Sequence, residues 1–290
     1  SGPNEDQPGP KFADYTDWFG VFRKYSPEQE SCTPVGTVLD SVDDWREKVV
    51  FPDLSKIDWT EGSADFVRDP DRALITRMNG GIFQRLHALM GFENALVDMI
   101  TKPEKTREFL EALADFEIEV FLRMNEVYHY DVMMYHDDWG TAKAPFFSVD
   151  LFKETLLPPT IRIFKAVREA GAIPFHHCCG LIDAFVPFMA GEIGVDAIEI
   201  QAINDVRHIV QTYGDRLTVE YTRPDPYFFY DPDTTAEMVQ AKARDIVDVY
   251  GAQANPGAGV LIAIIARDEE LYYAFHDELY RYSLEKYAAA

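Results

Sequence analysis

Two histidines and two cysteines stand side by side in the segment GAIPFHHCCG, residues 171–180, and Cys32 is the only other cysteine of the chain. Imidazole nitrogen and thiolate sulfur are preferred ligands of zinc, so a histidine and a cysteine close together could share one ion. Two adjacent cysteines could instead form a redox pair. The third interpretation is that all four residues belong to an ordinary buried strand.

Side-chain alternation divides these four residues into two pairs. If residues 172–178 form a strand, His177 and Cys179 lie on one face, and His176 and Cys178 lie on the other. Only one of the two pairs can therefore face a site. Gly180 follows at once and marks the start of a loop. From the residues alone, a metal site and burial against a helix both stay open.

A second polar segment, YHDDWG at residues 135–140, also ends an expected strand. It brings His136, Asp137, Asp138 and Trp139 to the same rim. The carboxylates could orient a substrate or transfer a proton, which makes His136, Asp137 and Asp138 the candidate catalytic residues. The alternative is that an aspartate caps a helix or pairs with an arginine.

Other expected strands also carry polar side chains on one face. Glu199 and Gln201 share a face of the strand at 196–201, and Glu220 lies on a face of the strand at 217–222. Polar faces on neighbouring strands are difficult to explain as core packing, so they indicate a binding site. The candidate substrate-binding residues are Trp139, Gln201, Glu220, Tyr221, Arg77 and Asn79.

From residue 72 onward, short β-rich segments alternate with longer helical ones. The expected strands are 72–79, 131–138, 172–178, 196–201, 217–222 and 259–265, and the expected helices are 81–101, 103–128, 150–170, 181–192, 205–213, 232–250 and 268–287. Strict alternation implies parallel strands joined by right-handed crossovers, in an open sheet or a closed barrel. In a barrel, active sites lie at the carboxyl ends of the strands. Residues 12–70 show no clear period and are expected to cap one end of the sheet.

Composition limits the kinds of partner and compartment. With 50 acidic against 27 basic residues, the formal charge is −23, which argues against nucleic acid and anionic membranes. No apolar run reaches the length of a membrane span. Three cysteines cannot form a disulfide framework, so we expect a cytoplasmic protein. Residues 1–11 are expected to be a flexible leader, and residues 12–290 a single domain.

Several segments together resemble the uroporphyrinogen decarboxylase superfamily. They are DWREKVVFPDLSKIDW (44–59), GFENALVDMITKPE (91–104), DDWGT (137–141), FHHCCG (175–180) and GVDAIEIQ (194–201). Within the superfamily, the chain most resembles the corrinoid-dependent methyltransferases, including the methyltransferase components of O-demethylase systems. The resemblance covers roughly residues 15 to 285 and implies a (β/α)8 barrel of the TIM type. Because "DWFG" already begins at Asp17, the barrel is expected to be shortened or modified at its N-terminus.

The resemblance also implies a metal site. Zinc in such enzymes is usually held by a His-x-Cys pair, which here falls on His177 and Cys179, and by a later cysteine. Ala258 stands where that cysteine is expected, in the segment NPGAGV. The candidates for the third ligand are Glu220, Glu199 and Cys178.

The implied activity is transfer of a methyl group from a small methylated substrate to a corrinoid carried by a partner protein, with zinc as a further cofactor. The most plausible donor is a methyl ether such as a methoxylated aromatic compound. The alternatives are a lyase similar to uroporphyrinogen decarboxylase, and a barrel without chemistry that acts as a binding or accessory protein. The oligomeric state stays open, with a homodimer as one option.

Overall fold

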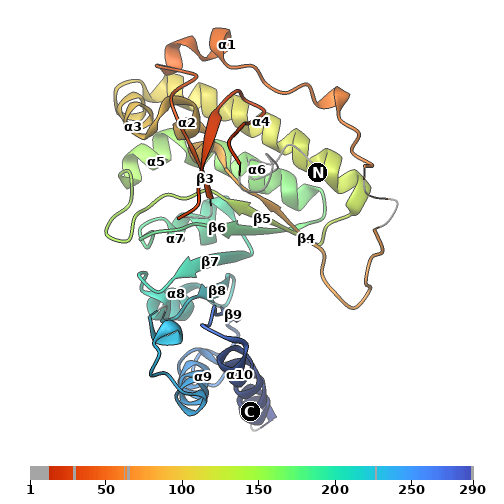
Figure 1. The fold of residues 1–290 in the computed structure, drawn as a ribbon, viewed down its shortest axis with the longest axis vertical. Helices are drawn as coiled ribbons and strands as arrows, with labels where there is room; N and C mark the ends of the chain where they lie inside the picture. Colours follow the sequence, from red (N-terminus) through yellow and green to blue (C-terminus); the bar gives the residue numbers. More distant parts are fainter. Residues whose placement is uncertain (1–12, 29–30, 62, 64–65, 226, 289–290) are drawn as a thin grey trace.

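A parallel six-stranded sheet forms the centre of the molecule (Figure 1). The structure is a computed structural model, and it describes residues 13–28, 31–61, 63, 66–225 and 227–288. In sheet order, which is also chain order, the strands are β4 (Ile75–Met78), β5 (Val132–His136), β6 (Ile173–His177), β7 (Ala197–Gln201), β8 (Thr218–Thr222) and β9 (Val260–Ala263). All six strands predicted from the sequence are confirmed. The predicted leader, residues 1–11, lies outside the described residues.

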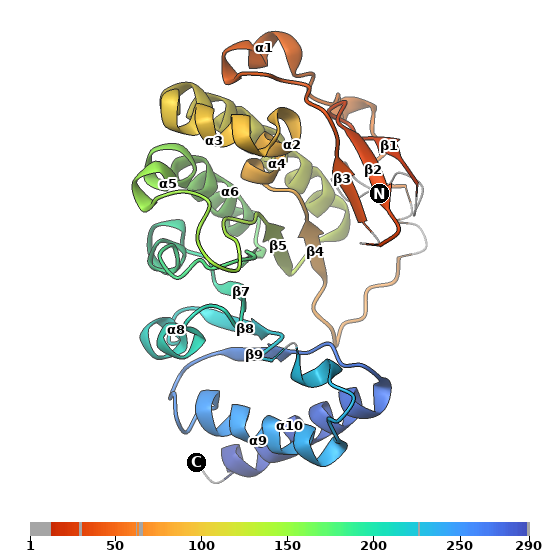
Figure 2. The same cartoon turned by 60° about the vertical axis from the view of Figure 1, so that its left-hand side comes forward.

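The strands curve into an arc with helices on its outer side, as Figure 2 shows. Every neighbouring pair is parallel, and the outermost strands, β4 and β9, do not pair with each other in the described part of the chain. The architecture is therefore that of a (β/α)8-type barrel in which six parallel strands are described.

Helices connect the strands and cover the convex side of the sheet (Figure 1). They are α2 (Ile82–Met90), α3 (Phe92–Thr101), α4 (Pro103–Tyr128), α5 (Val149–Thr155), α6 (Leu157–Glu169), α7 (Val186–Phe188), α8 (Val206–Tyr213), α9 (Ala236–Tyr250) and α10 (Glu269–Ala288), with a π-helical turn at Met189–Ile193 and a 3-10 turn at Phe228–Tyr230.

Two helices predicted as continuous are each divided in two. The predicted helix 81–101 breaks at Gly91, whose φ of 79° a helix does not accommodate. The predicted helix 150–170 breaks at Leu156, because Pro158 and Pro159 follow and have no N–H to donate to the preceding turn.

The N-terminal segment forms a small antiparallel sheet and short helices. These are β1 (Tyr15–Thr16), β2 (Phe22–Ser26), β3 (Ser31–Pro34), α1 (Trp45–Lys48) and the 3-10 turns Val42–Asp44 and Leu54–Lys56. The ring of Trp45 stacks on Phe109 of α4, and Phe19 meets Phe116 of α4 edge-on, each with ring centroids 5.2 Å apart. The segment therefore packs on α4, beside the β4 edge of the sheet.

The two faces of the sheet differ in what they contact. Side chains on the convex face join the main core with the helices, for example Tyr135, Ile198 and Val219. On the concave face, Met134 and Phe175 belong to a smaller cluster near the amino ends of the strands. The concave face is the axial face of the barrel, and its polar residues lie at the carboxyl ends.

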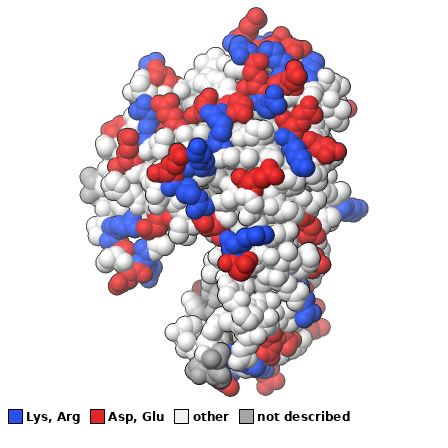
Figure 3. Space-filling model, turned by 180° about the vertical axis from the view of Figure 1, so that it is seen from behind, with Lys and Arg blue, Asp and Glu red and all other residues white. Residues whose placement is uncertain are grey.

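Acidic and basic side chains are interspersed over much of the surface seen from behind in Figure 3. None of the described helices is long and apolar enough to cross a membrane.

Candidate metal centre

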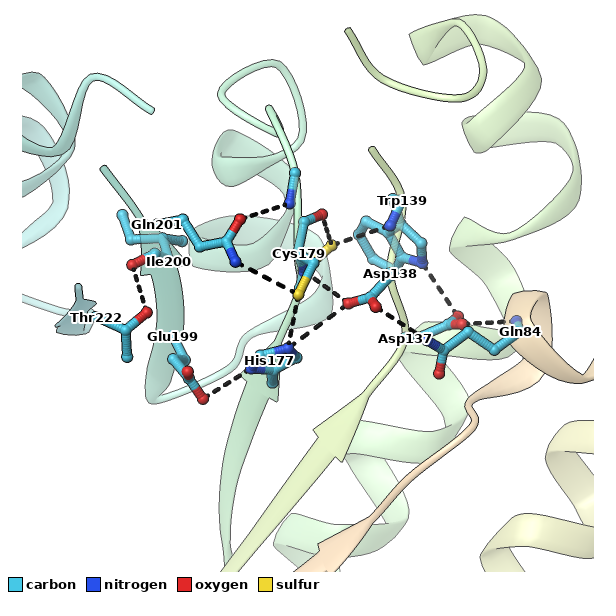
Figure 4. Close-up of polar contacts among 12 residues, drawn as sticks. Gln84, Asp137, Asp138, Trp139, His177, Cys179, Glu199, Ile200, Gln201 and Thr222 are labelled. Atoms are coloured by element: carbon cyan, nitrogen blue, oxygen red, sulfur yellow. Dashed lines mark hydrogen bonds and ion pairs between the residues drawn. The ribbon is translucent and has the colours of Figure 1, made fainter. Parts of the chain in front are cut away.

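The carboxyl end of β6 places His177 and Cys179 on the axial face. Their ligand atoms, Nε2 and Sγ, are 3.2 Å apart (Figure 4). His176 and Cys178 lie on the opposite face, where both are buried in the core at 0% and 1% exposure. The alternation predicted from the sequence is confirmed.

Asp138, two residues beyond the end of β5, completes a group of three. Its Oδ1 lies 3.6 Å from Nε2 of His177 and accepts a hydrogen bond of 2.6 Å from the backbone N–H of Cys179. Its Oδ2 accepts one of 3.0 Å from the amide of Gln84 in α2. The three ligand atoms lie within 4.8 Å of one another, and no other such group occurs in the part of the chain that the structure describes. We call Asp138, His177 and Cys179 the ligand cluster.

A carboxylate orients His177 from behind. Glu199 of β7 places Oε2 2.7 Å from Nδ1 of His177, so that Nε2 faces Cys179 and Asp138. Burial alone would lower the pKa of His177, but hydrogen bonds to Cys179 and Glu199 and their negative charge raise it to about 10. Without a metal, the imidazole therefore holds a proton that an incoming cation would displace.

The donor atoms of the ligand cluster fit zinc. Nitrogen, sulfur and oxygen ligands on a tetrahedral zinc ion lie about 3.3 to 3.6 Å from one another, close to the separations around His177. Three protein ligands leave a fourth position for a substrate atom or water. A carboxylate behind the histidine, as Glu199 provides, is the usual outer support of such a site.

Asp137, predicted as a catalytic residue, has a different role in the structure. Its side chain is completely buried and accepts hydrogen bonds from the backbone of Phe83 and Gln84 and from Nε1 of Trp139. Burial raises the pKa of Asp137 to about 7 in spite of these bonds. With no exposed oxygen, Asp137 anchors the start of α2 and does not reach the axial space.

Two residues predicted to bind substrate lie on the wrong face for that role. Trp139 is 0% exposed and packs among core aromatic rings, including Phe152. Tyr221 faces the helices, where its hydroxyl donates to the carbonyl of Pro224 and its ring meets Tyr250. Alternation along β8 already places Tyr221 opposite Glu220, so this prediction is corrected by the strand geometry itself.

Three other predicted residues do surround the ligand cluster. His136 stacks on His177 with ring centroids 4.1 Å apart, and burial together with the charge of His177 lowers its pKa to about 4. Gln201 places its amide nitrogen 3.6 Å from Sγ of Cys179. Glu220 is paired in register with Glu199, and burial and the charge of Glu199 raise its pKa.

The candidates predicted for the third ligand lie outside the ligand cluster. Glu199 contacts the opposite nitrogen of His177, and Glu220 lies one strand further away. Sγ of Cys178 instead accepts a hydrogen bond of 3.2 Å from the backbone of Trp139 in the core. The third member of the ligand cluster is instead Asp138. Asp138 follows His136 by two residues, and this spacing was the sequence signal that could have identified it.

Ala258, at which the resemblance implied a cysteine ligand, lies away from the ligand cluster. It precedes β9, whose Val260 pairs with Val219, and it approaches Gly214 beyond the amino end of β8. The ligand cluster lies at the opposite, carboxyl end of the strands. The identity of residue 258 therefore does not bear on the completeness of the cluster.

Close backbone contact holds the two loops of the ligand cluster together. Gly180 has a φ of +93°, and a Cβ at this residue would lie 2.1 Å from the backbone carbon of Gly140. Leu181 donates a backbone hydrogen bond of 2.8 Å to Thr141 of the same loop. Only glycine at residue 180 permits this approach.

Arg77 and Asn79, also predicted to bind substrate, lie in the wall of a pocket at the free edge of β4. Arg77 is paired in register with Met134, whose side chain lies on the axial face of the sheet.

Comparison with known proteins adds a family and a fold. Residues 34–264 match the family model described as uroporphyrinogen decarboxylase (URO-D). No curated protein matches the chain significantly. Among solved structures, a methyltransferase from Methanosarcina mazei aligns with a TM-score of 0.66 at 14% identity, covering 93% of this chain and 76% of that one. A chitinase from Chromobacterium violaceum aligns less well, with a TM-score of 0.38 at 8% identity over 72% of this chain and 99% of that one.

Proposed function

Because the chain belongs to the uroporphyrinogen decarboxylase family, we propose that its barrel serves methyl transfer in a corrinoid-dependent system. The donor is a small methylated molecule, most plausibly a methyl ether, and the acceptor is a reduced corrinoid carried by a separate protein. The observation that carries this proposal is the ligand cluster, with Glu199 behind His177. The fold shared with the methyltransferase from Methanosarcina mazei supports it.

Five polar side chains at the rim have defined tasks in this proposal. Asp138, His177 and Cys179 would hold zinc, which when bound supplies Lewis acidity toward an oxygen or sulfur atom of the substrate. Glu199 keeps the ring of His177 in the orientation for binding. Gln201, beside Sγ of Cys179, restrains that ligand.

The transfer also needs a proton. The bond between the methyl carbon and the substrate oxygen breaks, the carbon bonds to the acceptor, and the oxygen takes up a proton. Glu220 is suited to hold that proton, because it lies on the axial face near Glu199 and burial raises its pKa. Asp137, which is completely buried, is not suited to this task.

The test combines metal analysis with an activity screen. Purified protein is analysed for zinc and then incubated with methoxylated aromatics and methylated amines, with and without a reduced corrinoid protein. We expect one equivalent of zinc, and methyl loss that needs both the corrinoid protein and the metal. Turnover without any corrinoid, or full turnover by metal-free protein, would contradict the proposal.

A further inference from the structure

Asn204 lies in the loop between β7 and α8, three residues after Gln201, and is only 6% exposed. Its side chain reaches across to the loop that follows β6. There its Oδ1 accepts a hydrogen bond of 2.8 Å from the backbone N–H of Ile182, and its Nδ2 donates one of 3.0 Å to the carbonyl of Gly180. Asn204 therefore holds the backbone directly after the ligand Cys179.

The carboxamide of Asn204 is also tied to its own loop. Its Nδ2 donates a second hydrogen bond, of 3.1 Å, to the carbonyl of Gln201, which also accepts one of 3.1 Å from the backbone N–H of Asn204. The two carbonyl partners require a donor, and the N–H of Ile182 requires an acceptor. A single orientation of the carboxamide therefore serves all three bonds, and a carboxylate of the same size could not replace it.

Gln201 continues this connection to the metal ligand itself. Its Oε1 accepts a hydrogen bond of 3.3 Å from the backbone N–H of Gly180, and its amide nitrogen lies 3.6 Å from Sγ of Cys179 (Figure 4). Because Gln201 contacts the N–H of Gly180 and Asn204 contacts its carbonyl, both peptide groups of this residue are held from the β7 side. The position of Sγ at the preceding residue depends on this backbone.

The backbone N–H groups of residues 179–182 donate alternately to the two neighbouring strands and their loops. Those of Cys179 and Leu181 donate to the loop after β5. Those of Gly180 and Ile182 donate to side chains at the end of β7 and in the loop after it. The loop that carries Cys179 is thus held from both sides, and loss of the contacts on one side would let it shift toward the other.

We infer that Asn204 is a positioning residue of the metal centre. By holding the backbone of the loop after β6, it directs Sγ of Cys179 toward the other members of the ligand cluster. Asn204 acts on the ion only through Cys179. This inference rests on the metal binding that the proposed function assigns to the ligand cluster, but not on the identity of the methyl donor or acceptor.

Asn204→Asp tests the inference in purified full-length protein without any corrinoid protein. The substitution preserves the size of the side chain and an acceptor for Ile182, but it removes both donated hydrogen bonds and places a charged oxygen beside two carbonyl oxygens. We expect zinc affinity, measured by competition titration, to fall about tenfold. In the cobalt(II)-substituted protein, the charge-transfer absorption from the Cys179 thiolate should weaken and shift, because Sγ moves relative to the ion.

Asn125 of α4 offers a matched control beyond the opposite, amino ends of the strands. Its Nδ2 donates a hydrogen bond of 3.1 Å to the carbonyl of Ala170, and its Oδ1 accepts one of 2.9 Å from the N–H of Tyr130. Asn125→Asp therefore breaks a contact of the same kind away from the ligand cluster. Both variants should be less stable in urea unfolding, whereas only Asn204→Asp should change the zinc affinity and the cobalt spectrum. A merely structural role of Asn204 would affect unfolding alone.

If Asn204→Asp does not fold, as judged by circular dichroism, Asn204→Ser replaces it, with Asn125→Ser as its control. A zinc affinity and a cobalt spectrum like those of the wild type, or equal changes in the Asn204 and Asn125 variants, would overturn the inference and leave the proposed function standing. A wild type that binds neither metal would contradict the metal centre and the inference together. Metal binding that responds to Asn204 in a protein without methyl transfer would count against the proposed function alone.

Discussion

The two faces of β6 carry the same residue types in opposite environments. His177 and Cys179 meet Glu199, Asp138 and Gln201 on the axial face. On the other face His176 is completely buried among aromatic rings, and among the described residues neither of its ring nitrogens has a hydrogen-bond partner.

The pKa values follow these environments. Burial, together with the charges of the neighbouring histidines, lowers the pKa of His176 to about 3, whereas the partners of His177 raise its pKa to about 10 in spite of burial. Burial raises the pKa of the Cys178 thiol well above its ordinary value. Neighbouring residues of identical type thus differ in their chemistry because of the strand face on which they lie.

The largest expected difference between the faces is in metal binding. Cys179→Ser should weaken zinc binding by at least about a hundredfold, because it replaces a thiolate ligand with a poorer donor. Cys178→Ser, one residue away on the core face, should retain one equivalent of zinc. Zinc content after dialysis against a chelator, followed by competition titration, measures both. An equal loss of zinc from the two variants would show that the axial face and the core face of β6 do not differ in metal binding.

A smaller difference in zinc affinity is expected between substitutions of Glu199 and of its neighbour Glu220. Glu199→Gln removes the carboxylate behind His177 and should weaken zinc binding about 10- to 100-fold, as the loss of an outer support does. Glu220→Gln, at the paired position of β8, should leave zinc affinity within about threefold of the wild type. The same competition titration compares them. An equal effect of the two substitutions would show a general charge effect.

The uncharged state of enclosed histidines can also be tested at His87, a half-buried residue of α2. Burial lowers the pKa of His87 to about 4, with the charge of Arg23 acting in the same direction and that of Asp138 against it. Between pH 6.5 and 4 the unfolded chain therefore binds a proton that the folded chain does not, and stability falls as the pH falls. Over this range we expect His87 to account for a loss of about 2.5 kcal/mol in the free energy of unfolding.

His87→Phe preserves the ring contacts with Phe83 and Phe92 and removes this titration. Urea unfolding followed by circular dichroism at a series of pH values should give a flatter pH dependence for the variant. Identical slopes for the variant and the wild type would show that the pKa of His87 is the same in the folded and the unfolded chain.

The smallest expected effect is that of His176→Phe. The side chain lies among Tyr135, Trp139 and Phe164, and its ring nitrogens form no hydrogen bond within the part of the chain that the structure describes. We expect the free energy of unfolding at pH 7 to change by less than about 1 kcal/mol, and zinc content to stay at one equivalent. Urea unfolding and metal analysis measure these. A loss of zinc would mean that the core face supports the metal directly.

Periodicity explains why much of the fold was predictable. The six strands are short apolar segments between longer helical ones, and their alternation also assigned His177 and Cys179 to one face correctly. The break at Gly91 was not predicted, because the apolar pattern continues through it. The start of the last strand directly after Ala258 was also predicted, since the apolar run begins at the end of a glycine-rich segment.

The division of labour between Asp137 and Asp138 was not predictable from the residues. Both follow the same strand, and both are carboxylates. Their roles separate because α2 begins beside Asp137, where a Cβ at Gly81 would lie 2.5 Å from the aspartate Cβ. Only the folded chain brings that helix start within reach, so the sequence could indicate a polar rim but not which oxygen faces it.

The contact between Gly140 and Gly180 has a mechanical consequence. Because the two loops touch backbone to backbone, a displacement of the segment that carries Asp138 would also displace the segment that carries Cys179. The same contact restricts change, since lengthening either loop would displace both ligands together.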